Sequence, residues 1–370
     1  MPIIILMIAV FAVFFIIRKV YDKQWSKNLT ASVKFKEDAA YENEKTQLVE
    51  VISNDKLLPI PILDIDFNLH RNLRFANTAN SAVSDKLYRR DIFSIGSKKR
   101  ITRNLDIICH KRGYYTLDKV NLTAHDIFLK GKYHTSFDSN DEIYVYPERI
   151  SSERINIPFS QIMGEVLSRQ KMLEDPFEFG GIRDYMITDP MKYINWKASA
   201  KAGGLVVNQH DTTITQKITI ILDTYRTVSP LEDYLTEESI RLTAALAERV
   251  INQGIALNIV GNGQDILSGE FLRLYDLKGT DMEFLRKTFA RIVWHDEITA
   301  DRIIGSIKPS ENELYVFITK NTEEENIKAF ENLAGRNTAI MIVPYRDELP
   351  KVESNKFRVV PWKAASGTKL

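Results

Sequence analysis

The most apolar stretch of the chain lies at its very start. Residues 2–17 contain no polar side chain, and Arg18 and Lys19 follow at once. A helix over this stretch spans about 24 Å, slightly less than the ~30 Å hydrocarbon core of a bilayer. Local thinning and long basic side chains reaching the headgroups accommodate such a mismatch. The pattern therefore predicts a membrane-spanning helix within residues 1–20.

A secretory signal peptide is the competing interpretation of this stretch. Such a peptide carries positive charge before the apolar run and a small-residue cleavage site after it. Here the basic residues follow the run, as Arg18, Lys19, Lys23 and Lys27. The positive-inside rule then predicts a single-pass protein of the cell membrane whose remaining residues are cytoplasmic.

Residues 29–150 show the short-period pattern of β-strands. Apolar, β-branched and aromatic residues alternate with polar ones, and Asn-Asp, Pro and Ser-Asp turn signals interrupt them. No helical stretch of ten residues is indicated. Several short strands that need cover on both faces predict an immunoglobulin-like β-sandwich.

The pattern changes after residue 215, where strand runs alternate with helical ones. Thr280 and Thr322 each begin a capping box, with a glutamate three residues later. A helix is predicted around residues 236–252. The predicted strands are 217–222, 255–260, 313–319, 338–343 and 357–362. Such a βαβ series requires a mostly parallel sheet with helices on both faces. The chain thus divides into an anchor (1–20), a β-sandwich (29–150), a connector (151–214) and an α/β domain (215–363).

Composition and motifs exclude several classes of protein. The chain has 50 Lys and Arg residues and 49 Asp and Glu residues, so it has no large positive electrostatic field that would attract nucleic acid. Cys109 is the only cysteine, which excludes an internal disulfide. No phosphate-binding loop, serine-hydrolase elbow or zinc-protease helix occurs, and the histidines have no ligand spacing. We therefore predict a non-catalytic protein that binds no nucleic acid.

The connector contains the most distinctive segment of the sequence. Asp189-Pro190 has the form of a helix start, and Gly203-Gly204 has the form of a stop. Together they predict a helix of about a dozen residues with one apolar face packed on the sheet. Trp196 is predicted to belong to the core.

The same segment resembles the hallmark of a bacterial family called "domain of unknown function 58". The matching positions are Glu178, Phe179, Arg183, Tyr185, Asp189, Ile194, Asn195, Trp196, Lys197, Ala198, Ser199, Ala200, Lys201, Leu205 and Val207. Residues 111–130 resemble a second family motif. Asn195 departs from the usual aspartate, and Lys201 replaces an arginine and so loses bidentate donation.

The resemblance implies a fold and a set of partners. Family members resemble membrane-anchored proteins with a β-sandwich and a von Willebrand factor A-like (Rossmann-like) α/β domain, which gives a multidomain fold class. The resemblance implies a MoxR-type AAA+ ATPase as the main partner and a transglutaminase-like membrane protein as a second candidate partner, in assembly or maturation. Family members commonly begin with two membrane spans, so an upstream span could be missing here.

Asp223 follows a predicted strand at the position where A-type domains hold a metal ion. Open α/β sheets bind ligands at this edge, and the metal loop of A-type domains reads Asp-x-Ser-x-Ser. Here the three positions are Asp223, Tyr225 and Thr227, and a tyrosine oxygen lies too far out along its ring. Thr280 is a candidate second ligand, although helix capping explains it equally well, and Lys320 stands where an aspartate is expected.

We therefore predict a degenerate metal site with no metal and no other cofactor; Mg²⁺ or Mn²⁺ would be the ion of an intact site. One hypothesis is that the Lys320 ammonium lies beside Asp223 and replaces the charge of the ion. The alternative is that Lys320 points into water.

The functional prediction is a cytoplasm-facing interaction or assembly factor acting with a MoxR-type ATPase. Its partner surface is expected at loops 180–190, 223–230, 261–265 and 319–323. One alternative is an extracellular adhesion-like module, which requires the opposite orientation in the membrane. Another is an enzyme that uses the polar cluster Arg183, Asp189, Asn195 and Lys197.

Overall fold

The computed structural model forms two compact units. One comprises Met1–Arg149 with Phe289–Arg291, and the other comprises Ile150–Thr288 with Ile292–Leu370. The residues described are 2–77, 81–83, 86–126, 131–172, 179–187, 189–210, 217–225, 230–294, 297–310, 313–335 and 337–365.

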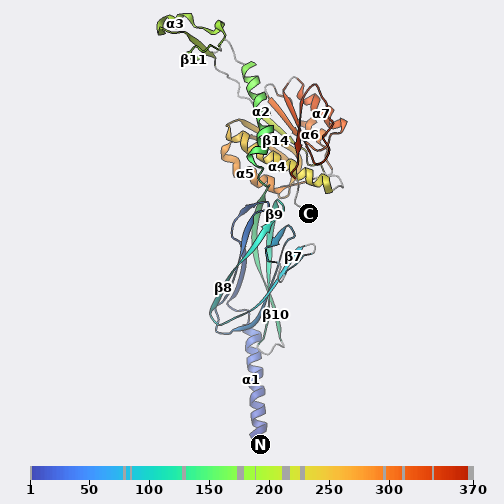
Figure 1. Cartoon of the computed structure of the whole chain (residues 1–370). Helices are drawn as coiled ribbons and strands as arrows, with labels where there is room; N and C mark the ends of the chain where they lie inside the picture. The colour runs from blue at the N-terminus through green and yellow to red at the C-terminus, as the bar shows by residue number, and fades with distance from the viewer. Residues whose placement is uncertain are drawn as a thin grey trace. The chain divides into compact units, whose positions relative to one another are not determined.

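The chain begins with helix α1 (Pro2–Gln24) (Figure 1). Twenty-three residues correspond to about 35 Å of helix, so α1 extends beyond the apolar run. It is long and apolar enough to cross a membrane, and a signal sequence passes the same test. Most of its apolar side chains up to Val20 are exposed, whereas Tyr21 and Trp25 are buried. The end of α1 is therefore part of the first unit.

Two sheets of the first unit enclose a common core. One has the order β1 (Leu29–Phe35), β3 (Lys45–Asn54), β8 (Lys99–Cys109), β5 (Leu73–Phe75). The other has the order β2 (Ala39–Tyr41), β10 (Lys132–Tyr146), β9 (Gly113–His125), β4 (Ile60–His70), β7 (Lys86–Ile95), β6 (Ser81–Val83). Ile52 of β3 and Ile65 of β4 are fully buried in this core. The strands form because their alternating apolar residues face the opposite sheet.

The second unit contains a seven-stranded sheet flanked by helices. Its order is β15 (Phe271–Leu277), β14 (Ala256–Asp265), β13 (Lys217–Leu222), β17 (Glu313–Ile318), β18 (Ala339–Tyr345), β19 (Arg358–Lys363), and β16 (Ile292–Val293) pairs with β14. Helices α6 (Ala300–Ser306) and α7 (Glu324–Ala334) cover the face that carries Ile221 and Phe317. Helix α4 (Pro230–Asn252) contacts β13, β14 and β18. The remaining helices are α2 (Ser152–Met172) and α5 (Met282–Arg291).

The fold-class prediction needs correction, because the chain is largely β and no clear von Willebrand factor A-like (Rossmann-like) domain is evident. Nineteen strands lie among the described residues. In the second unit β15 and β16 run antiparallel to β14, and residues 346–357 join the parallel strands β18 and β19 without a helix. Sequence periodicity located the parallel strands of this sheet and helix α4, but it missed β15 and β16, and it does not determine how the strands connect.

Candidate functional site

The segment with the family resemblance forms a hairpin with a short helix in its loop. Strands β11 (Phe179–Asp184) and β12 (Val206–His210) pair antiparallel, with Arg183 opposite Val207. The loop contains a 3-10 turn η1 (Met191–Tyr193) and helix α3 (Trp196–Ala202). The prediction of one helix of about a dozen residues is therefore wrong.

Asn195 explains why the helix is broken. Its side-chain oxygen accepts a hydrogen bond from the backbone amide of Ala198 at 2.9 Å, which makes Asn195 the N-cap of α3. Asparagine competes for backbone amides in this way and so begins helices rather than continuing them. Gly203 ends α3 with a left-handed φ of 74°, as its position predicted.

Arg183 and Asp189 form a two-pronged ion pair across the loop. The two guanidinium nitrogens lie 2.6 and 2.7 Å from the two carboxylate oxygens, and the amide of Met186 donates to the same carboxylate at 2.8 Å. These donors lower the pKa of Asp189 to about 2. Asp189 thus closes the loop and does not cap a helix.

The other residues that carry the family resemblance either support the loop or face solvent. Ser199 joins α3 to β12, since its hydroxyl accepts from the amide of Val206 at 2.9 Å. The backbone amide of Tyr185 donates to Leu205 at 2.9 Å. Lys197 and Lys201 are exposed. The polar residues of the motif therefore hold the loop, and its lysines face solvent.

Large apolar side chains on this segment are exposed. Trp196 is 64% exposed, so the prediction that it belongs to the core is wrong. Helix α3 buries none of its residues. The other exposed apolar residues are Ile182, Met186, Ile187, Met191 and Leu205. We call this set with Trp196 the apolar loop surface. Exposed aromatic and methionine side chains gathered in one segment are typical of protein-binding sites.

Asp223 lies in a buried hydrogen-bond network that joins the ends of β13 and β17 to Asn262 within β14. Its carboxylate accepts from Asn262 Nδ2 at 2.9 Å, Thr319 Oγ1 at 2.7 Å and the amide of Tyr225 at 3.0 Å. Asn262 in turn accepts from the amide of Thr224 at 2.6 Å. Neutral donors therefore surround the carboxylate and tie β13 to β14 and β17.

The other residues of the predicted metal site do not gather around Asp223. Tyr225 contributes its backbone amide. Thr280 lies in η2 (Gly279–Asp281), which follows the end of β15; because Leu277 pairs with Leu257 at the start of β14, Thr280 lies at the opposite edge of the sheet. Thr227 lies outside the described residues. Lys320 is half-buried next to Thr319, and its proximity to Asp223 stays a prediction. Among the described residues, no group of His, Cys, Asp and Glu has metal-binding geometry.

Sequence reasoning missed Asn262 and Thr319. Thr319 follows β17 and Asn262 lies in the last part of β14, and both strands neighbour β13, so the rule that ligands gather at the carboxyl edge of a sheet was the available signal. Neither residue belongs to a motif that could single it out in the sequence.

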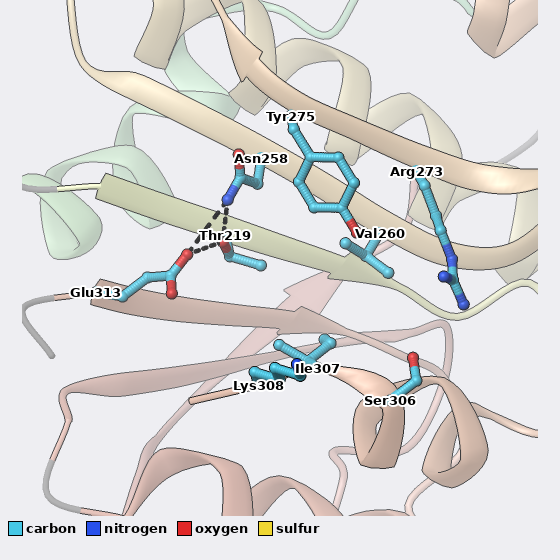
Figure 2. A pocket seen from close by; sticks show the side chains of 9 residues that line it. All are labelled: Thr219, Asn258, Val260, Arg273, Tyr275, Ser306, Ile307, Lys308 and Glu313. Atoms are coloured by element: carbon cyan, nitrogen blue, oxygen red, sulfur yellow. Dashed lines mark hydrogen bonds between the residues drawn. The ribbon is translucent and has the colours of Figure 1, made fainter. Parts of the chain in front are cut away.

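A cavity lies elsewhere on the sheet (Figure 2). It is lined by Thr219, Asn258, Val260, Arg273, Tyr275, Ser306, Ile307, Lys308 and Glu313. The buried Glu313 carboxylate accepts hydrogen bonds from Thr219, from Asn258 at 3.4 Å and from Tyr315 at 2.9 Å. Its acceptors are thus engaged by the protein itself, so the polar floor of the cavity supports the sheet.

The sequence matches no family model and no curated protein. Similar solved structures include the CARDB domain of the PF1109 protein from Pyrococcus furiosus (15% identity, 30% of this chain and 86% of that chain, TM-score 0.21). The sixth cohesin of scaffoldin B from Acetivibrio cellulolyticus, in complex with a Cel5 dockerin, has 13% identity (32% and 99%, TM-score 0.23). A non-cellulosomal cohesin from Archaeoglobus fulgidus also has 13% identity (35% and 97%, TM-score 0.21). None of these three similarities supports the predicted von Willebrand factor A-like class or the predicted family.

Proposed function

We propose that this chain is a membrane-tethered, non-catalytic interaction factor whose partner binds the apolar loop surface. The observation that carries the proposal is the exposure of Trp196 at 64%, Met191 at 68% and Ile187 at 95% in one segment braced by the Arg183–Asp189 pair. Interfaces concentrate binding energy in a few aromatic and apolar anchors. A braced loop loses less conformational entropy when it binds, so it retains more of that energy.

The partner we propose is a MoxR-type AAA+ ATPase, and the hallmark residues are what support it. The membrane tether rests on α1, and the cytoplasmic orientation rests on the basic residues that follow its apolar part. An ATPase that consumes cytoplasmic ATP requires this orientation. A transglutaminase-like membrane protein is a further proposed member of the assembly.

The polar cluster offers little to an enzyme. Arg183 and Asp189 neutralise each other, and the Asn195 side chain caps α3. A catalytic acid or base must reach a substrate proton inside a site that positions it. The cavity of Figure 2 is lined by other residues. These contacts favour binding over catalysis.

The test compares matched surface variants of the full chain in detergent. The double variant Met191→Ser, Trp196→Ser removes two anchors of the apolar loop surface. The control double variant Phe284→Ser, Leu349→Ser removes two side chains that are 52% and 63% exposed outside that surface. Binding of the MoxR-type ATPase from the source organism is measured by surface plasmon resonance.

Loss of two anchors is expected to weaken binding at least tenfold, since each anchor typically contributes more than about 1 kcal/mol. The control variant is expected to bind as the unchanged chain does. Equal binding by all three proteins, or no binding by the unchanged chain, would overturn the proposed partner surface. Protease accessibility of residues beyond 30 in intact cells tests the orientation, and cleavage from outside the cell would favour the adhesion-like alternative.

A further inference from the structure

Helix α1 is fixed to the base of the β-sandwich. We define the base as the end of the sandwich formed by residues 26–28, 54–59 and 96–99. The Tyr21 side chain is 1% exposed, and its hydroxyl donates to the carbonyl oxygens of Pro59 at 3.2 Å and His125 at 3.3 Å. The Tyr133 ring lies 5.5 Å from the Trp25 ring, and its hydroxyl donates to Asp22. Helix and sandwich therefore move together.

The apolar part of α1 ends close to these contacts. Tyr21 lies four positions after Ile17, which corresponds to about 6 Å along the helix axis. The polar headgroup region on each side of a bilayer is about 5–7 Å thick. When residues 2–17 occupy the hydrocarbon core, the base therefore lies at the level of the headgroups.

The base carries an exposed apolar side chain at the level of the headgroups. Leu57 is 76% exposed at the tip of the loop that follows β3. The loop is held in place, because the Asn54 amide group donates to Leu58 at 3.0 Å and to Gly96 at 2.8 Å. The amide of Lys98 donates to Lys56 at 3.0 Å and joins the neighbouring turn to it. Leu57 is thus exposed on a structured loop.

Basic side chains accompany Leu57. The exposed lysines in the second half of α1, in the turn that follows it and where the turn before β8 meets that strand are Lys19, Lys23, Lys27, Lys98 and Lys99. The acidic neighbours are engaged locally: Asp22 accepts from Tyr133, and Asp55 accepts from Ser53 Oγ at 3.0 Å. Each lysine at an anionic lipid surface contributes about 1 kcal/mol to the free energy of membrane binding, which corresponds to about fivefold in the binding constant. The surface combines an apolar tip with positive charge, as interfacial membrane contacts do.

We infer that the base of the sandwich is a membrane-contact surface, on which Leu57 enters the headgroup layer and the lysines bind anionic lipid phosphates. This inference rests on the membrane tether of the proposed function and adds a second, lipid-specific contact to it. The contact sets the height and tilt of the sandwich above the bilayer.

The experiment places an environment-sensitive fluorophore on single introduced cysteines in the full chain. Cys109 is buried, and burial raises the pKa of its thiol to about 12, so labelling is confined to the introduced residue. Leu57→Cys reports on the base. Arg71→Cys, at the far end of β4 and about 33 Å away, is the matched control. Val10→Cys reports on the insertion of α1. Each protein is placed in nanodiscs of brominated phosphatidylcholine, with or without brominated phosphatidylglycerol.

The label at position 57 is expected to be quenched several-fold more strongly than the label at 71, and more strongly with phosphatidylglycerol. The double variant Lys98→Glu, Lys99→Glu is expected to reduce this quenching, whereas Lys45→Glu, Arg71→Glu at the far end leaves it unchanged. Equal quenching at 57 and 71, with strong quenching at 10, would overturn the contact and leave the tether standing. If quenching at position 57 changed neither with lipid charge nor in the variant Lys98→Glu, Lys99→Glu, the proposed binding of anionic lipid would be wrong. An unquenched label at 10 would overturn the tether itself.

Discussion

The hydroxyl of Thr319 donates a hydrogen bond of 2.7 Å to the Asp223 carboxylate, and this bond ties the end of β17 to the end of β13. Both side chains are fully buried. The same hydroxyl also accepts from the amide of Asn321 at 2.9 Å. One threonine therefore satisfies a buried anion and a part-buried loop amide together.

The Thr319→Val variant tests how much this hydrogen bond contributes to the stability of the fold. Valine keeps the shape but removes the partner of a part-buried amide and of a buried carboxylate oxygen, and the loss at the buried oxygen costs about 1–3 kcal/mol. We expect the free energy of unfolding to fall by that order, measured by urea denaturation of the full chain in detergent. Thr280→Val, at the opposite edge of the sheet and exposed, is the control and should change stability little. Equal losses in the two variants would contradict the role given to Thr319.

The same network predicts how the protein responds to divalent ions. Asp223 is the one carboxylate within this set of hydrogen-bonded side chains, and its described partners are neutral donors. A magnesium-sized ion prefers several close oxygen ligands in octahedral geometry. We expect isothermal titration with Mg²⁺ or Mn²⁺ to show no micromolar binding. Binding that disappears in Asp223→Ala would refute this prediction and restore the metal site.

The Arg183–Asp189 pair predicts a response to acid. The folded-state pKa of Asp189 is lowered to about 2, below its ordinary value of 3.8, chiefly by the hydrogen bond from Arg183 and then by the Met186 amide. A lowered carboxyl pKa means that the pair stabilises the loop above about pH 4 and that this stabilisation is lost as the pH falls toward 2. We expect Arg183→Gln to raise the pKa of Asp189, measured by NMR titration of its carboxyl carbon. Glu324, which pairs with Lys328 in α7, serves as the internal control. An unchanged pKa of Asp189 in the variant would argue against the pair.

Individual residues show which features the sequence could predict. The strands of the sandwich follow from alternation, since β3 alternates buried with less buried positions along its whole length. The position of Gly203 correctly predicted the end of α3. The exposure of Trp196 could not be predicted, because seven helical residues have no burial pattern of their own and tertiary contacts decide their environment. The network of Asp223 with Asn262 could not be predicted either, since sequence spacing does not show which strand ends meet.

Lys56 at the base of the sandwich predicts a second effect of pH. Its Nζ is buried without a hydrogen-bond partner, and burial lowers its pKa from 10.5 to about 8. The unfolded chain then binds more protons than the folded one between pH 8 and 10.5, so the contribution of this group to stability rises with pH across that window. We expect Lys56→Met to unfold at a higher temperature than the unchanged chain at pH 7 in neutral detergent. The difference should shrink as the pH approaches 10.5, and a constant difference across this range would show that the ammonium is not the cause.

Asn195 is one of two positions, with Lys201, at which the segment differs from the pattern of the family that it resembles, and its contacts predict the effect of an aspartate there. The role of Asn195 Oδ1 is to accept from the amide of Ala198, and an aspartate oxygen accepts equally well while its charge favours the positive start of a helix. We therefore expect Asn195→Asp to preserve α3 or to stabilise it slightly. Asn195→Ala removes the cap and should weaken α3 by about 1 kcal/mol. Hydrogen exchange at the Ala198 amide measures both changes directly, and ATPase binding by the same variants shows whether the apolar loop surface needs an ordered α3. If the Ala198 amide exchanged as slowly in Asn195→Ala as in the unchanged chain, the cap would not hold the helix. Another contact would then have to explain the exposed position of Trp196.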